Sequence, residues 1–66
     1  MKPELKRALN KFVHEYFGKD CFVAEPEKGR KRAYVMKRVK DSFAYEIVGE
    51  IGWSKMDNGC LRIAVL

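Results

Sequence analysis

The stretch YVMKRVKDSFAYEIVGEIGW, residues 34–53, decides how this chain folds. Apolar and polar residues alternate on both sides of the Asp41-Ser42 pair, and this period of two predicts two β-strands joined by a tight turn. A two-residue turn at that pair places Met36 opposite Ile47. Because directly opposed residues of an antiparallel pair point to the same face, the hairpin predicts a sheet with one apolar face that needs a cover.

The period of two continues on both sides of this hairpin. Turn-forming residues separate the segments at EPEKGR, VKDSFA and KMDNGC. Three-residue loops in the first and last of these would set Phe22 opposite Tyr34 and Trp53 opposite Ile63. We therefore expect four strands, over residues 21–25, 31–39, 43–54 and 60–66.

The segment before these strands, residues 3–17, has a helical period instead. Its apolar residues form one stripe, made of Leu5, Ala8, Leu9, Phe12, Val13, Tyr16 and Phe17. Pro3 suits the first helical turn, and Gly18 follows where a left-handed residue ends a helix. We predict a single α+β domain over residues 1–66, with an N-terminal helix packed on one face of a four-stranded antiparallel meander (α-β-β-β-β).

The three expected hairpins agree on the face that the helix would cover. This face consists of Phe22, Ala24, Tyr34, Met36, Tyr45, Ile47, Ile51, Trp53, Leu61, Ile63 and Val65. The opposite face keeps an apolar strip with charged borders, formed by Val23, Val35, Val48 and Ala64. Such a strip is either a partner or homodimer surface, or simply a set of β-branched residues that favour strands.

Length, composition and charge narrow the class of protein. A chain of 66 residues that is 47% apolar and 35% charged is typical of one small folded domain. It has no apolar run near the ~20 residues of a membrane helix and no secretory signal, so we expect a cytoplasmic protein without a membrane partner. Residues 19–42 hold eight basic and four acidic residues of a chain whose net charge is +5, which favours an anionic partner.

The basic residues gather in two groups within residues 28–40. The first group is Lys28, Arg30, Lys31 and Arg32, and the second is Lys37, Arg38 and Lys40. On a β-ribbon these side chains would contact the phosphates of DNA or RNA, which gives affinity without sequence readout. They also suit an edge strand guarded against aggregation, or contact with an acidic protein. Tyr34 is expected under the helix, which argues against an aromatic platform for single strands.

The sequence does not indicate a catalytic or cofactor site. His14 is the only histidine and falls on the polar side of the predicted helix. Glu46 and Glu50 lie about 13 Å apart along a strand, too far to share a proton. Cys21 and Cys60 are expected as reduced thiols on opposite edges of the sheet, and they lack the paired spacing of a zinc site. We therefore expect no enzyme, cofactor, metal or small-molecule substrate.

Two functions remain. The first is a small basic non-enzymatic binding domain that contacts nucleic acid through the basic hairpin between the first two strands. The second is a protein-interaction module or inhibitor that uses the outer sheet face, with a homodimer as one version. The two differ in which substitutions matter, namely charge removal at Arg30 and Arg32 for the first, and changes at Val35 and Val48 for the second.

Overall fold

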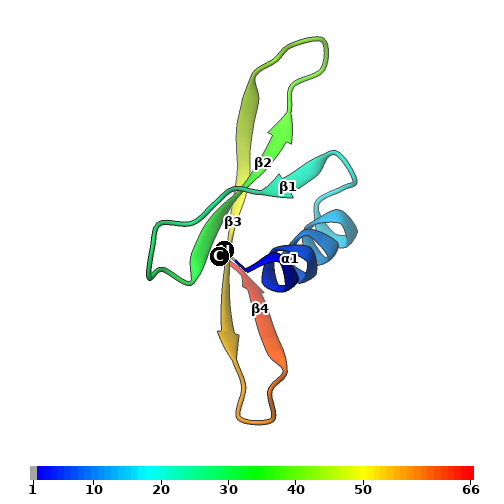
Figure 1. Cartoon of the computed structure of the whole chain (residues 1–66). Helices are drawn as coiled ribbons and strands as arrows, with labels where there is room; N and C mark the ends of the chain where they lie inside the picture. Colours follow the sequence, from blue (N-terminus) through cyan, green and yellow to red (C-terminus); the bar gives the residue numbers. More distant parts are fainter. Residues whose placement is uncertain (1) are drawn as a thin grey trace.

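A computed structural model describes residues 2–66 and consists of one helix followed by a four-stranded antiparallel sheet (Figure 1). The elements are α1 (Pro3–Tyr16), β1 (Cys21–Val23), β2 (Arg32–Arg38), β3 (Tyr45–Lys55) and β4 (Leu61–Val65). The strand order is β1-β2-β3-β4, so the predicted α+β fold and its meander sheet are confirmed. Within residues 2–66, no helix has both the length and the apolar character needed to cross a membrane.

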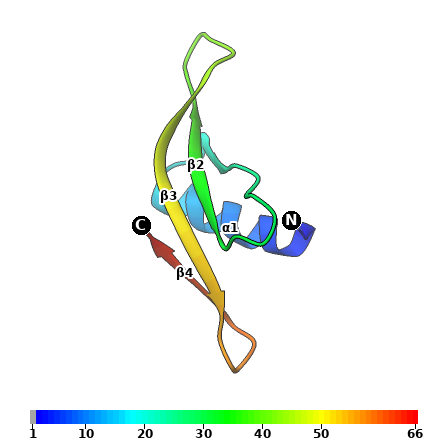
Figure 2. The ribbon, with the colours of Figure 1, turned by 90° about the vertical axis from the view of Figure 1, so that its left-hand side faces the viewer.

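Strand β3 is the longest strand of the sheet. It is 11 residues long and pairs with β2 along its first part and with β4 along its last part. The sheet curls, and the β2–β3 and β3–β4 hairpins extend in opposite directions beyond α1 (Figures 1 and 2). The molecule is therefore elongated, with principal extents of 43 × 24 × 22 Å.

Two of the expected hairpin registers are confirmed. Met36 pairs with Ile47 between β2 and β3, and Trp53 pairs with Ile63 between β3 and β4. Gly59, in the loop between β3 and β4, has a φ of 85°, a left-handed conformation that glycine adopts without strain. The β3–β4 loop has the expected three residues, since the Met56 N–H donates to the Cys60 carbonyl. The expected two-residue turn between β2 and β3 is wrong: the Val39 N–H donates to the Ala44 carbonyl across a loop of residues 40–43, which keeps the same register.

A β-bulge shifts the register between β2 and β3. Met36 pairs with Ile47, whereas its neighbour Val35 pairs with Gly49, so Val48 is an extra residue on β3. One extra residue moves every later side chain to the other face of the sheet. After Val48, the β3 residues that an unbroken strand would place on one face of the sheet therefore point to the other face. The single apolar face expected from an unbroken strand does not form.

Strand β1 is shorter than expected, and its connection to β2 is longer. Phe22 pairs with Met36 instead of Tyr34, and residues 24–31 form an open loop. The predicted three-residue loop is therefore wrong. Pro26 explains the early end of the strand, because proline has no N–H to continue the ladder toward β2. The register differs by two residues, an even number, so the faces of β1 and β2 stay matched.

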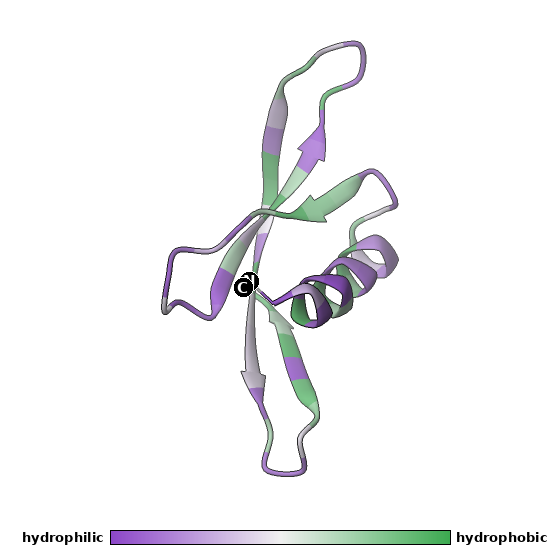
Figure 3. Ribbon diagram, viewed as in Figure 1, coloured by the Kyte–Doolittle hydropathy of each residue, from purple (hydrophilic) through white to green (hydrophobic). Residues whose placement is uncertain are grey.

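Helix α1 turns its apolar side toward the sheet and its charged side away from it (Figure 3). The buried core consists of Leu9, Val13, Cys21, Val23, Ala33, Val35 and Ile51. Half-buried Trp53, Leu61 and Ile63 extend this core along β3 and β4, where the expected face is confirmed. The expectation is wrong for six residues, which the register places on the face turned away from α1: Phe22, Ala24, Tyr34, Met36, Tyr45 and Ile47.

The helix also holds the free edge of β1. Val23 is the last residue of this edge strand, and its N–H donates to the Asn10 side-chain oxygen at 2.9 Å. The bond satisfies a backbone donor that faces no neighbouring strand. It therefore fixes α1 in position along the sheet edge.

Candidate nucleic-acid interface

The β1–β2 loop carries the first basic group, here called the loop cluster. Its members are all exposed and are Lys28, Arg30, Lys31 and Arg32. Lys28 and Gly29 form a turn in which Gly29 has a φ of 85°. The Arg30 N–H donates to the Glu27 carbonyl at 3.0 Å and closes this turn. The backbone thus gathers the four cations at one end of β2.

Two members of the loop cluster form ion pairs at the surface. Arg30 Nε lies 3.2 Å from Glu27 Oε2, and Arg32 Nη2 lies 3.5 Å from Glu50 Oε1. The four side chains are between 31 and 79% exposed, so water screens both pairs and each is weak. The two lysines of the cluster form no ion pair within residues 2–66. The carboxylates of Glu25, Glu27 and Glu50 line one hollow with Arg30 and Arg32, so the four cations of the loop cluster keep a formal net charge of +1.

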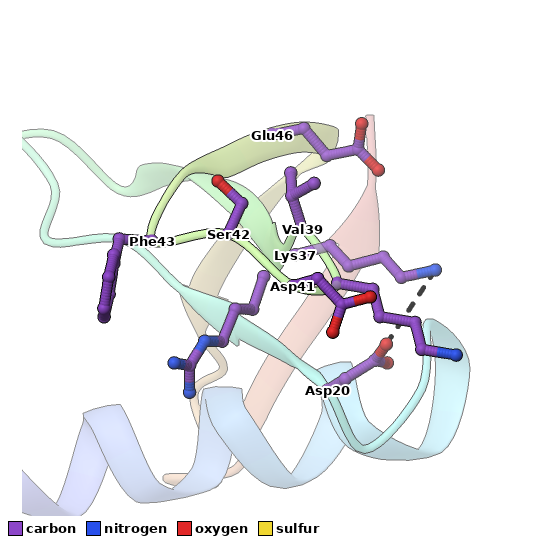
Figure 4. Close-up of a pocket in the computed structure, with 9 residues that line it drawn as sticks. Asp20, Lys37, Val39, Asp41, Ser42, Phe43 and Glu46 are labelled. Atoms are coloured by element: carbon purple, nitrogen blue, oxygen red, sulfur yellow. Dashed lines mark ion pairs between the residues drawn. The ribbon is translucent and has the colours of Figure 1, made fainter.

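The second basic group lies in a different electrostatic setting. Lys37, Arg38 and Lys40 line a shallow hollow at the end of the β2–β3 hairpin (Figure 4). The carboxylates of Asp20, Asp41 and Glu46 line the same hollow. Lys37 Nζ lies 3.8 Å from Asp20 Oδ2. Three cations and three carboxylates leave the hollow with no net formal charge, so this group attracts a polyanion less than the loop cluster does.

The sheet face turned away from α1, here the outer face, carries large side chains. β1 contributes Phe22, β2 contributes Arg32, Tyr34, Met36 and Arg38, and β3 contributes Tyr45, Ile47 and Glu50. Tyr34, Tyr45 and Ile47 are 52%, 54% and 59% exposed. The expectation that Tyr34 lies under the helix is therefore wrong, and aromatic rings are open to solvent on the same face as two arginines.

The rings of the outer face are arranged across β2. The ring centroids of Phe22 and Tyr45 lie 5.2 Å apart in an edge-to-face arrangement, an attractive geometry for aromatic pairs. Met36, half-buried, pairs with Phe22 on one side and with Ile47 on the other. The Phe22 ring thus gives Tyr45 a packing partner on the outer face, while Tyr45 stays 54% exposed.

The apolar strip expected as a partner or dimer surface is not a surface. Val23 and Val35 are 3% and 0% exposed because they lie under α1, and they cannot touch a partner. Val48 occupies the bulge and is 39% exposed, and Ala64 is exposed on β4. The prediction failed at the two buried valines because an unbroken alternation along β3 assigned them to the wrong face.

Sequence reasoning missed Phe22, Tyr34 and Tyr45 as surface residues, although two signals were present. An isolated glycine inside a strand pattern, here Gly49, commonly marks a β-bulge. In the segment RAYVMKR, arginine, tyrosine, methionine and arginine stand at alternate positions from Arg32, while the small residues between them suit close packing. The second signal agrees with the observed faces of β2, but it does not decide between them, because Tyr34 and Met36 are also apolar enough to be buried.

His14 and Cys21 lie in different settings. His14 is exposed on α1, and within residues 2–66 no three His, Cys, Asp or Glu side chains gather where they could hold a metal ion. Burial raises the pKa of the Cys21 thiol, and the neighbouring Asp20 carboxylate raises it further. A raised pKa reduces the thiolate fraction, so Cys21 is a poor nucleophile.

Comparison of the chain with protein-family models, with curated proteins and with solved structures found no match.

Proposed function

We propose that this chain is a small non-enzymatic domain that binds nucleic acid by contacting its phosphates through the loop cluster. The observation that carries the proposal is the loop cluster itself, in which four exposed cations on one loop face only weak, screened carboxylate partners. Arginine and lysine side chains in this setting bind phosphate by charge-assisted hydrogen bonds. Lys37, Arg38 and Lys40 assist from the other end of β2.

The test is the binding of labelled duplex and single-stranded DNA and RNA between about 50 and 200 mM salt. The triple variant Arg30/Lys31/Arg32→Ala removes three charges from the loop cluster. The control Lys6/Arg7/Lys11→Ala removes three charges from exposed positions of α1. We expect the first variant to lose affinity and to lower the salt slope by about 0.7–0.9 for each phosphate contact removed.

The control separates a local site from general positive charge. If the α1 variant weakens binding as much as the loop variant, net charge alone causes the affinity and the loop cluster is not a site. Absence of binding to every nucleic acid at the lowest salt refutes the proposal outright. Melting curves of both variants must match that of the parent chain, so that a loss of binding is not a loss of fold.

A second candidate function is a protein contact through the outer face. The observation in its favour is the exposed apolar surface of Tyr34, Tyr45 and Ile47, since contiguous exposed apolar side chains often mark contact surfaces. A homodimer is one form of this contact, and an acidic protein partner is another. Sedimentation over a hundredfold range of concentration tests the dimer, with Ile47→Lys as the variant expected to abolish it.

We also propose a cytoplasmic location. Cys21 and Cys60 are both free thiols, and Cys60 is exposed. An exposed free thiol suits a reducing compartment, because it oxidises or exchanges readily elsewhere.

A further inference from the structure

The outer face of β2 has an arginine at each end and two large side chains between them. Arg32, Tyr34, Met36 and Arg38 point to this face because the residues between them point toward α1, where Ala33 and Val35 are buried. The two arginines lie about 20 Å apart along the strand at ~3.3 Å per residue. An exposed tyrosine ring therefore lies on a row that begins and ends with a guanidinium group.

The neighbouring strands widen this row into a surface. Phe22 approaches from β1, and Tyr45 and Ile47 from β3, with the Phe22 and Tyr45 rings in edge-to-face contact. Tyr34 and Tyr45 each remain about half exposed. In the register, Tyr45 pairs with Arg38 and Tyr34 lies two residues from Arg32. Each exposed ring thus has an arginine close by on the same face.

This combination suits the two parts of a single nucleic-acid strand. Unstacked bases offer π-faces to aromatic rings, and stacking of this kind tolerates any base. Arginine side chains beside the rings bind the phosphates that connect those bases. A duplex keeps its base faces stacked inside the helix, so exposed tyrosine rings would gain little from it.

We infer that the outer face binds single-stranded nucleic acid, with bases stacked on Tyr34 and Tyr45 and phosphates held by Arg32 and Arg38. The inference rests on the proposed function and names the class of nucleic acid that the domain takes. Arg32 is also a member of the loop cluster, so the other cations of that cluster continue the path of the nucleic-acid backbone beyond the rings.

Net charge favours a polyanion over a second copy of the chain on this face. The outer face has Arg32, Arg38 and Arg62 as its strand cations, and the carboxylates of Glu25, Glu27 and Glu50 line a hollow with Arg32 and Tyr34. The chain as a whole carries a formal net charge of +5, so two copies repel each other, whereas a polyanion is attracted.

The test measures fluorescence anisotropy of labelled strands of about 12 nucleotides, within the ~4–16 nucleotides typical of such sites. Single-stranded DNA and RNA are compared with the matched duplexes. The variants are Tyr34→Ala and Tyr45→Ala, and the control is Tyr16→Ala, whose ring lies on α1 and is 64% exposed. Tyr34→Phe and Tyr45→Phe keep the ring and should keep the affinity.

We expect tighter binding to single strands than to duplexes. Each Tyr→Ala change on the outer face should weaken single-strand binding by about fivefold or more, while leaving the salt slope unchanged. The control Tyr16→Ala should have no effect. Loss of affinity in Tyr34→Ala with full retention in Tyr34→Phe would identify ring stacking as the cause.

The possible failures are distinguishable. Equal or tighter duplex binding, with the tyrosine variants unaffected and the loop variant weakened, would overturn this inference and leave the proposed function intact. Absence of binding to any nucleic acid would overturn both. If Tyr34→Ala instead dissociates a dimer detected by sedimentation and nucleic acid has no effect, the outer face belongs to self-association and the inference is wrong.

Discussion

The ring of Phe17 lies against the backbone of Gly49, next to the bulge in β3. A Cβ atom added at Gly49 would lie 2.8 Å from Cε1 and 2.9 Å from Cζ of that ring. Contacts this short do not occur between carbon atoms at rest, whose optimal separation is about 3.5–4.0 Å. Gly49 therefore lets Phe17, the residue that follows α1, approach the sheet next to the bulge in β3.

Substitution of Gly49 by alanine should destabilise the fold by about 1–2 kcal/mol, because the Phe17 ring has to move away from its position. The effect is measured by urea unfolding. A double-mutant cycle supplies the control. In a Phe17→Ala background the space is empty, so Gly49→Ala should then be nearly neutral. An equal cost in both backgrounds would mean that the ring does not pack against Gly49.

The different burial of Val35 and Val48 predicts different losses of stability when each is replaced by alanine. Val35 is fully buried, so Val35→Ala should cost about 2–3 kcal/mol from lost burial and the cavity that remains. Val48 is 39% exposed at the bulge, and Val48→Ala should cost less than about 0.5 kcal/mol. Chemical denaturation of the two variants compares them directly. Similar costs at both positions would contradict the bulge and favour an unbroken strand.

The hydrogen bond from the Val23 N–H to Asn10 predicts a cost for removing the acceptor. Asn10→Ala should destabilise the protein by about 1 kcal/mol, because the backbone donor at the sheet edge loses its partner. Asn10→Asp keeps an oxygen in the same place and should retain most of the stability. Amide hydrogen exchange at Val23 provides the local measurement. Unchanged protection of that amide in Asn10→Ala would show that the bond is not formed in solution.

Burial predicts a pH dependence for Cys21. The pKa of its thiol is raised in the folded state, first by burial and then by Asp20, so the native protein holds this proton more tightly than the unfolded chain does. The stabilisation is fully present below the unfolded pKa of about 8.5 and declines as the pH rises toward the folded value. Above pH ~8.5 the parent chain should therefore lose stability faster than Cys21→Ala.

Thermal melting from pH 7 to 10 measures this difference. Cys60→Ala serves as the control, since Cys60 is exposed and its removal should leave the pH dependence of the parent unchanged. Parallel melting curves for the parent and Cys21→Ala would indicate that the Cys21 thiol ionises as easily in the folded state as in the unfolded one.

Local sequence determined the elements and their order. The 3.6-residue stripe around Leu9 and Val13 predicts α1, and both residues are fully buried. The turn residues around Asp41 predict the connection between β2 and β3 and the Met36–Ile47 pairing, although the loop covers residues 40–43 instead of two residues. These features depend on backbone propensities and on periods within a few residues. They therefore do not require contacts between residues that are far apart in the sequence.

The tertiary structure alone decided which sides of β1 and β2 the helix covers. Both faces of β2 are apolar enough to be buried, so composition does not distinguish Ala33 and Val35 from Tyr34 and Met36. The choice depends on one extra residue in β3, because strand faces alternate with a period of two and a single insertion exchanges them. That exchange opens the aromatic side of the sheet to solvent, where it forms the surface that we propose as the binding face.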